Sequence, residues 1–319
     1  MRHGGSFTAL AVGMSLLLAP AAGASAGPGA SCVYVPQTRQ LFVVIKHADE
    51  AVPENAPDGQ AVIGRYADRI AGIDSDSATP VPCSGGEPTV FNTDQVFVRK
   101  TRSVESAELG LDLRQGLLAP GVTPERDGTP EIEVSADIGR GKVVIAMTTG
   151  PDHVLIGTAE RAAAVDFNGV EQIHDVDLIA GSSPLVVYGG LGDDVLDAAP
   201  GAGLDPAGAR TSPTTLLGGP GDDLLVGTSR NDLIQGDRGT DLVAAGGGGD
   251  VVLGYDRHVD RIDCGAGDDR FVYVDRSDEL RDCEGSRFSD PLKARNSSQI
   301  GRITVSPRVT TFPTVSAVP

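Results

Sequence analysis

Aspartate recurs with a nine-residue spacing in the second half of this 319-residue chain. From Gly218 the chain reads GGPGDDLLV, GTSRNDLIQ, GDRGTDLVA, AGGGGDVVL, a lengthened GYDRHVDRID and CGAGDDRFV, and an earlier copy, GGLGDDVLD, begins at Gly189. The sixth position of the regular units is acidic, and in the lengthened unit the acid moves to Asp260; the regular set is Asp194, Asp223, Asp232, Asp241, Asp250 and Asp269. Calcium prefers carboxylate and carbonyl oxygens, whereas zinc prefers His and Cys, of which no cluster is present. The spacing therefore predicts calcium sites.

Glycine turns and short strands must position these acids. The first six residues of each unit form a turn that needs positive φ, which glycine adopts without steric cost. The last three residues form a strand whose middle residue points inward; that eighth position is Leu196, Leu225, Ile234, Val243, Val252, Ile262 and Phe271. Two units make one coil of 18 residues, so each loop is expected to stack on the second loop along, with adjacent strands ~4.8 Å apart. Carboxylates of one loop and carbonyls of the next can then surround one ion.

The charge of the chain agrees with a cationic ligand. Lys and Arg number 26 against 44 Asp and Glu, a formal net charge of -18. Between Gly189 and Cys283 there are 19 Asp and Glu and eight Arg, a difference of -11. Stacked carboxylates repel one another without counterions. A solvated acidic face is the alternative, but it does not explain the Gly–Asp–hydrophobic phasing. The charge argues against nucleic acid and anionic membrane surfaces as partners, because both repel an acidic protein.

The units resemble the nonapeptide G-G-x-G-x-D-x-U-x of the repeats-in-toxin (RTX), or hemolysin-type calcium-binding, family over Gly189–Val272. The copy beginning at Gly227 keeps only Gly227, Asn231 and Asp232 of its loop. The resemblance implies an all-β fold, a parallel β-roll that binds a row of Ca²⁺ ions. The metal-binding residues it implies are Gly190, Gly192, Asp194, Gly219, Gly221, Asp223, Asn231, Asp232, Gly239, Asp241, Gly248, Asp250, Asp260, Gly267 and Asp269.

Residues 27–187 have no clean period but are β-rich. LFVVI (41–45), TVFNTDQVFV (89–98), EIEVSADI (131–138) and KVVIAM (142–147) are typical of strands between Gly, Pro and Asp turns. GRYADRIAG (64–72) is the best candidate for a helix. TTGPDHVLIGT (148–158) is interpreted as a worn nonapeptide without a strong ion. The region also resembles the N-terminal part of secreted actinobacterial proteins that carry these repeats, through the early Cys32, TVFNTD after Cys83, and IEVSADIGRGKVVIAMTTGPDHVLIGT.

The expected organisation has four parts. They are a signal peptide at 1–26, a β-rich, solenoid-like region at 27–187, the calcium-binding β-roll with a disulfide cap at 188–285, and a flexible tail at 286–319. Phe7 to Ala22 is apolar, and Ala24-Ser25-Ala26 offers a small-residue cleavage site. A membrane anchor is the alternative, but the run of about 16 residues is short of the roughly 20 that a span needs. We therefore expect a secreted, extracellular protein.

Four cysteines in an oxidising compartment predict two disulfides. Of the three possible connectivities, the spacing favours Cys32–Cys83 and Cys264–Cys283. Cys264 and Cys283 are 19 residues apart, one coil plus one residue, which places them on stacked rungs ~5 Å apart, within the range a disulfide accepts. This pair would close the C-terminal end of the solenoid, where open strand edges need a cap.

Three functions are compatible with the sequence. No HExxH, G-x-S-x-G or Walker motif is present, so we expect no enzymatic activity. The favoured function is a secreted, monomeric calcium-binding β-roll with a structural or surface-interaction role. The alternatives are a calcium-dependent β-helix that binds or cleaves an extracellular polysaccharide, and a toxin or adhesin module.

Overall fold

We describe the fold from a computed structural model. It describes residues 30–46, 59–73, 83–105, 107–119, 121–123, 132–139, 141–159, 162–167, 176–178, 184–199, 212–269, 272–284 and 286–288. The ordered elements within these ranges are all β-strands, as expected for an all-β protein. The predicted signal peptide and residues 289–319 of the predicted tail lie outside the described residues.

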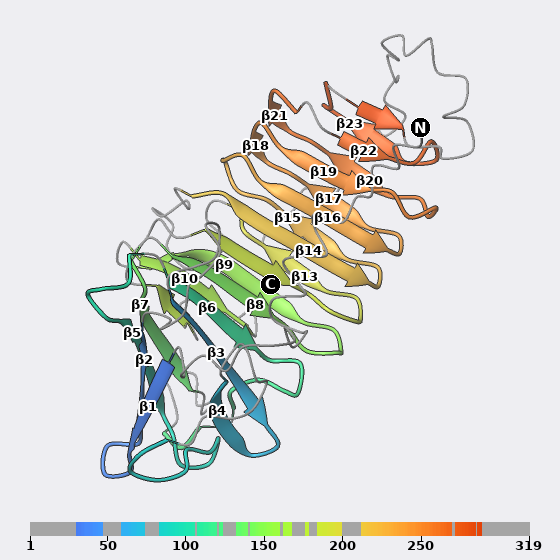
Figure 1. The fold of residues 1–319 in the computed structure, drawn as a ribbon. Coiled ribbons are helices and arrows are strands. Elements are labelled where there is room, and N and C mark those ends of the chain that lie inside the picture. The colour runs from blue at the N-terminus through green and yellow to red at the C-terminus, as the bar shows by residue number, and fades with distance from the viewer. Residues whose placement is uncertain are drawn as a thin grey trace, which may run out of the picture.

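Two long sheets run along the molecule. The strands follow one another from the N-terminal end, blue in Figure 1, to the C-terminal end, orange. The 12-stranded sheet has the order β1 (Ala30–Val35), β2 (Gln40–Ile45), β5 (Gln95–Lys100), β7 (Glu133–Asp137), β11 (Val176–Leu178), β10 (Ala162–Asp166), β9 (His153–Ala159), β13 (Val195–Asp197), β15 (Leu224–Val226), β17 (Leu242–Ala244), β20 (Arg261–Asp263) and β23 (Glu279–Arg281). The 10-stranded sheet has the order β24 (Ser286–Phe288), β22 (Val272–Val274), β19 (Val251–Gly254), β16 (Leu233–Arg238), β14 (Thr214–Pro220), β12 (Leu185–Tyr188), β8 (Lys142–Ala146), β6 (Ala107–Asp112), β3 (Gly59–Tyr66) and β4 (Arg69–Ile73). A third sheet pairs β18 (Gly247–Gly248) with β21 (Ala266–Gly267).

In the repeat region, consecutive coils stack as the period predicts. Leu224 lies opposite Leu242, and Leu233 lies opposite Val251, each 18 residues further along the chain. The strand pairs recorded among β12–β24 are parallel. Every second loop is therefore a neighbour in space, and the stacking expected from the sequence is confirmed.

The core is a thin aliphatic layer between the sheets. The six described eighth-position side chains are buried, which confirms their expected inward orientation: Leu196, Leu225, Ile234, Val243, Val252 and Ile262. Phe271 lies outside the described residues. Paired strands bring these side chains into rows, with Leu196 beside Leu225 and Leu225 beside Val243. Each coil therefore adds a rung of aliphatic side chains to one continuous core.

The N-terminal half continues both sheets but mixes strand directions. The β1–β2, β3–β4, β9–β10 and β10–β11 pairs are antiparallel, so the chain as a whole is mostly, not entirely, parallel. The strand predictions at 41–45, 131–138 and 142–147 are confirmed by β2, β7 and β8. Of residues 89–98 only 95–98 lie in a strand, because the Asn92 side chain accepts a hydrogen bond from the Thr89 N–H at 2.7 Å and closes a turn.

The best helix candidate, residues 64–72, is not helical. These residues form the β3–β4 hairpin, which turns through Ala67 at a φ of 53°. Parallel pairing of β3 with β6, from Gly59 opposite Ala107 to Gly64 opposite Asp112, holds the segment extended. Pairing with a distant strand has overridden the local pattern.

Both predicted disulfides are confirmed. Cys32 joins Cys83 with a Cα–Cα distance of 4.8 Å, and Cys264 joins Cys283 at 5.1 Å. The division predicted at residue 187 falls inside β12, which pairs with β8 on one side and with β14 on the other. Beyond the second disulfide, β24 pairs with β22 within the segment predicted as a tail, because its backbone extends the sheet. Within the described ranges there is no helical segment with the length and hydropathy of a membrane span.

Candidate calcium sites

The acidic residues of the loops form two columns, each along one long sheet. The first column lies where the chain enters strands of the 12-stranded sheet and consists of Asp152, Asp194, Asp223, Asp241, Asp260 and Asp278. In each step the backbone N–H of one aspartate donates to Oδ1 of the next, at 2.8, 2.8, 2.9, 2.9 and 3.2 Å. From Asp194 to Asp278, Oδ1 of each carboxylate thus accepts a hydrogen bond from the preceding coil and links two coils.

The second column enters the 10-stranded sheet in the same way. It consists of Thr214, Asp232, Asp250, Asp269 and Glu284. Its hydrogen bonds from N–H to the next carboxylate measure 2.7, 2.8, 2.8 and 3.3 Å. Glycine loops and coils of 18 or 19 residues thus bring the predicted acids together into the two columns, with one longer step of 29 residues between Asp194 and Asp223.

The second carboxylate oxygen is what distinguishes these sites. Within the two columns, Oδ2 is buried and has no hydrogen-bond partner in six aspartates: Asp194, Asp223, Asp241, Asp250, Asp260 and Asp269. Each of these residues is at most 2% exposed. A buried carboxylate without a partner is strongly destabilising, because the ion loses its hydration and gains nothing in return. A bound cation or a proton at each Oδ2 would remove this destabilising charge.

The pKa values of these aspartates show the same cost of burying an unpaired carboxylate. Burial, reinforced by neighbouring acids, raises the pKa of Asp194 to about 6 and that of Asp223 and Asp241 to about 7. Burial likewise raises the pKa of Asp250 and Asp260 to about 7, and that of Asp269 above its usual range. Without a metal ion, the four carboxyls with a pKa of about 7 are therefore partly protonated near neutral pH.

Oxygens from two coils converge beside the first glycine of a loop. A Cβ built on Gly189 would lie 2.4 Å from Asp194 Oδ2 and 2.7 Å from the Gly218 carbonyl oxygen. A Cβ built on Gly218 would lie 2.2 Å from Asp223 Oδ2 and 2.9 Å from the carbonyl oxygen of Gly236. Among the described residues, no group of three or more His, Cys, Asp and Glu side chains could hold a metal by itself. A carboxylate with backbone carbonyls is the hard-oxygen donor set that calcium accepts, so the residues fit that ion.

The predicted glycines allow the coils to approach one another. Gly192, Gly221 and Gly239 stack in the first column, where a Cβ on Gly239 would lie 1.7 Å from the Gly221 carbonyl oxygen. Gly248 and Gly267 stack in the second column with a corresponding distance of 1.3 Å. Gly190 and Gly219 precede the first-column loops with φ values of 118° and 119°. A side chain at these positions would separate the coils and strain the turns.

The copy that begins at Gly227 differs from the others. Asp232 is buried in the second column, but its Oδ2 accepts hydrogen bonds from the backbone N–H of Thr228 at 2.6 Å and from its hydroxyl at 2.8 Å. Asn231 is exposed, and its side-chain oxygen accepts a hydrogen bond from the Gly249 N–H. The structure therefore brings Asp232 into the column, but its carboxylate has partners from its own loop.

Sequence reasoning missed several residues of these sites. The first glycines of the loops, such as Gly189 and Gly218, border the converging oxygens, and their recurrence in the repeat was the available signal. Thr148 and Thr228 bond the carboxylates of Asp152 and Asp232, and a threonine four residues before an aspartate was the signal there.

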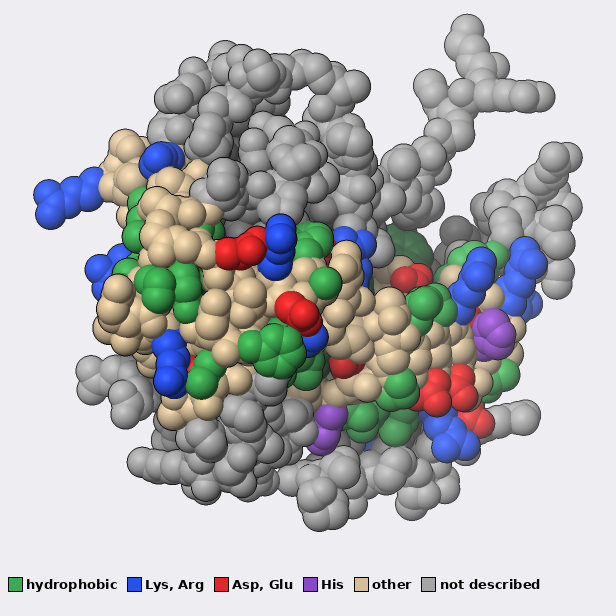
Figure 2. Space-filling view, turned by 90° about the horizontal axis from the view of Figure 1, so that it is seen from below, with side chains coloured by type: hydrophobic (Ala, Val, Ile, Leu, Met, Phe, Trp, Pro, Cys, Tyr) green, Lys and Arg blue, Asp and Glu red, His purple; other side chains and the backbone are tan. Residues whose placement is uncertain are grey.

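The column aspartates are distinct from the acids on the outer surface. The described part of the face in Figure 2 shows small separate groups of acidic side chains, most of them beside Lys or Arg. The column aspartates are instead enclosed between coils. A solvated acidic face therefore does not account for them.

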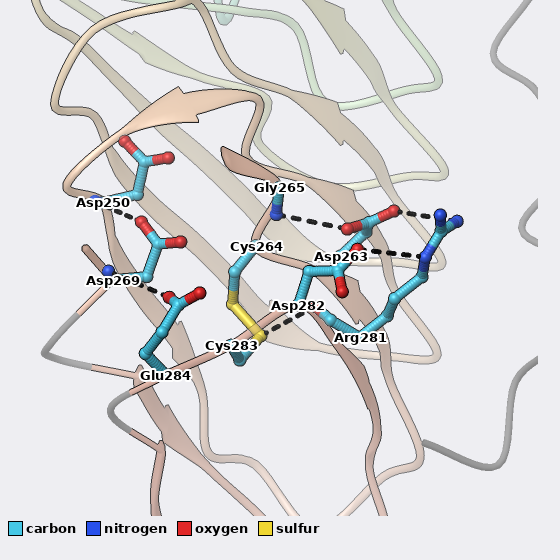
Figure 3. Close-up of a disulfide and its surroundings, with 9 residues drawn as sticks. All are labelled: Asp250, Asp263, Cys264, Gly265, Asp269, Arg281, Asp282, Cys283 and Glu284. Atoms are coloured by element: carbon cyan, nitrogen blue, oxygen red, sulfur yellow. Dashed lines mark hydrogen bonds and ion pairs between the residues drawn. A yellow bond between two sulfur atoms is a disulfide. The ribbon is translucent and has the colours of Figure 1, made fainter. Parts of the chain in front are cut away.

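The Cys264–Cys283 disulfide lies beside the end of the second column (Figure 3). Asp250, Asp269 and Glu284 follow one another in a row joined by backbone hydrogen bonds. The disulfide therefore links the last two coils of this column.

The repeats match a known family. A family model described as the RTX calcium-binding nonapeptide repeat matches four copies, at residues 186–204 and 217–252. No curated protein and no solved structure gives a significant match to the chain. Residues 186–204 and 217–252 thus consist of RTX calcium-binding nonapeptide repeats, a type of repeat that binds calcium.

Proposed function

We propose that this chain is a secreted calcium-binding β-roll protein with a structural or surface-interaction role and no catalytic activity. The observation that carries the proposal is the set of buried Oδ2 atoms without partners, repeated coil after coil in both columns. Calcium bound there would neutralise the carboxylates and join successive coils. Asp194, Asp223, Asp241 and Asp260 would hold the ions of the first column, and Asp250 and Asp269 those of the second.

Secretion and a non-catalytic role draw on further observations. Two disulfides suit an oxidising compartment, where millimolar calcium suits sites of ~10⁻⁴–10⁻³ M affinity. The unusual carboxylates are spaced along stacked turns, one to a coil in each column, and are buried. Such an arrangement supports holding ions in a row better than it supports acid–base chemistry on a substrate.

A glycan-binding role is the second candidate, because one observation favours it. The rings of Phe42 and Phe97 stack with centroids 5.2 Å apart on outward positions of β2 and β5. Beside them runs a ladder in which Gln40 donates to Gln95 and Gln95 donates to Glu133. Ring faces beside amides could contact a sugar, so binding of acidic polysaccharides that is lost in Phe97→Ala would support this role.

The calcium proposal is tested on the purified full-length protein. Far-UV circular dichroism and thermal unfolding are followed as calcium is added back after chelation, with magnesium as the comparison ion. At calcium concentrations of ten to a hundred times Kd, each site adds ~1.4–2.7 kcal/mol of stability. We expect β signal and melting temperature to rise with calcium.

Two variants locate the effect. Asp241→Asn, which weakens a buried ligand, should shift the calcium response to higher concentration. Asp237→Asn changes an exposed acid on the same coil at a φ of 74°, which asparagine tolerates, and should behave like the wild type. If neither the circular dichroism spectrum nor the melting temperature of the wild type changes when calcium is added, the proposal is rejected.

A further inference from the structure

Two loops have a threonine at a place where five other loops have a residue with positive φ. Thr148 precedes Asp152 by four residues, and Thr228 precedes Asp232 by four. The Thr148 N–H and hydroxyl both donate to Asp152 Oδ2 at 2.9 Å. In the second loop the Thr228 N–H and hydroxyl donate to Asp232 Oδ2 at 2.6 and 2.8 Å. In both loops the oxygen that has no partner in the other repeats is satisfied twice.

The backbone of these two loops also differs. The same position in other loops has positive φ: Gly190 118°, Gly219 119°, Asp237 74°, Gly246 98° and Gly265 84°. In those loops the N–H turns away from the carboxylate; that of Gly190, for example, donates to the Gly218 carbonyl oxygen of the next coil. Thr148 and Thr228 do not have positive φ, and their hydroxyls also accept the N–H two residues on, from Gly150 and Arg230.

We infer that Thr148 and Thr228 take the place of calcium in their loops, so that Asp152 and Asp232 bind no ion. Two hydrogen-bond donors to a carboxylate satisfy it without a metal, because such charge-assisted bonds are strong and short. The inference rests on the proposed calcium function and departs from the expectation, drawn from the repeat pattern, that Asp232 is a ligand.

The two loops occupy corresponding places in the columns. The N–H of Asp152 donates to Oδ1 of Asp194, the first aspartate of its column with a partnerless Oδ2. The N–H of Asp232 donates to Oδ1 of Asp250, the first such aspartate of the second column. Each row of calcium sites therefore begins on a loop that is held by a threonine and needs no metal.

Calcium stoichiometry, measured by calorimetry on the full-length protein, tests the inference. Asp250→Asn should lower the number of bound ions by one, whereas Asp232→Asn should leave it unchanged. Thr228→Val keeps the shape of the side chain but removes the hydroxyl. It should also leave the stoichiometry unchanged, and it should lower the melting temperature by a similar shift in chelator and in calcium.

The outcomes distinguish calcium binding by the protein as a whole from the absence of an ion at Asp232. A wild-type protein that binds no calcium would reject the proposed function. A wild-type protein that binds calcium but loses one ion in Asp232→Asn or in Thr228→Val would overturn only the inference. If one of these variants does not fold, the other decides, and Thr148→Val provides the same measurement in the first column.

Discussion

Replacing Gly221 with alanine should disrupt the stacking of the coils for a purely steric reason. The φ of Gly221 is not positive, so an alanine backbone could adopt it. Its added Cβ, however, would lie 1.8 Å from the Gly192 carbonyl oxygen and 2.5 Å from the carbonyl carbon. Ordinary van der Waals contact begins at 3.4 Å. The two backbones would have to move apart by the difference, 1.6 Å, and neither has a side chain that could give way.

The size of the effect follows from what that movement breaks. The Gly192 N–H donates to the Pro220 carbonyl at 3.0 Å, and the Gly221 N–H donates to the Arg238 carbonyl at 2.8 Å. Overpacking costs ~1–3 kcal/mol, and each weakened hydrogen bond adds about 1 kcal/mol. We expect Gly221→Ala to lower the free energy of unfolding by ~3–5 kcal/mol. At about 2–4 °C per kcal/mol, the melting temperature should fall by ~6–20 °C.

Gly150→Ala is the matched control. Gly150 occupies the corresponding place in the coil before Gly192, its φ is not positive, and nothing lies within 4 Å of its Cβ position. This variant should be neutral or stabilised by up to ~1 kcal/mol, because alanine restricts the unfolded chain. Thermal unfolding of both variants in excess calcium decides the matter. Equal melting temperatures for the two variants would refute the stacking argument.

Three further predictions concern the ion columns and the cap. Asp241→Ala should lower calcium-dependent stability more than Asp194→Ala, since Asp241 has partnerless carboxylates on both sides and Asp194 on one; calorimetry and melting curves compare them. Replacing Cys264 and Cys283 with serine should cost ~3 kcal/mol, seen as a lower melting temperature, and non-reducing peptide mapping of the wild type should recover this pair. In chelator the raised pKa values, about 7 in the columns against 3.8 unfolded, mean that stability should fall as pH rises from about 4 to 8, because the folded state binds more protons. In excess calcium the ions compete with these protons, so stability should vary less with pH between about 5 and 8 than it does in chelator, and melting curves with the same pH slope in both conditions would contradict the assignment.

The repeat half of the fold could be predicted because one short pattern specifies turn, strand and stacking together. The Gly–Asp–hydrophobic phasing gave the inward positions of Leu225 and Val243 and the 18-residue register between them. The same register placed Cys264 near Cys283. In a solenoid, the residues that form each turn and strand recur with the same period as the contacts between coils. The repeat in the sequence therefore indicates both the local structure and the stacking.

The N-terminal half has no repeated pattern that specifies turns, strands and their pairing together. The β3–β4 hairpin turns at Ala67, a residue type that carries no turn signal, and its extended form depends on pairing with β6. The antiparallel β9–β10 pair likewise depends on contacts that no local pattern records.

Within the candidate sites, sequence could identify the acids but not the partners of each oxygen. Asp232 and Asp250 occupy the same position of the repeat and the same column. Only the loop geometry shows that Asp232 Oδ2 accepts two hydrogen bonds from Thr228 while Asp250 Oδ2 accepts none. The distinction is one of hydrogen-bond direction, which residue type alone does not determine.

The most direct test of the central claim is a crystal structure grown in calcium, with anomalous scattering used to locate the ions. The account predicts a row of peaks beside the buried Oδ2 atoms of Asp194, Asp223, Asp241 and Asp260, and a second row beside those of Asp250 and Asp269. Peaks confined to exposed acids, or carboxylates that remain buried with no ion beside them, would contradict it.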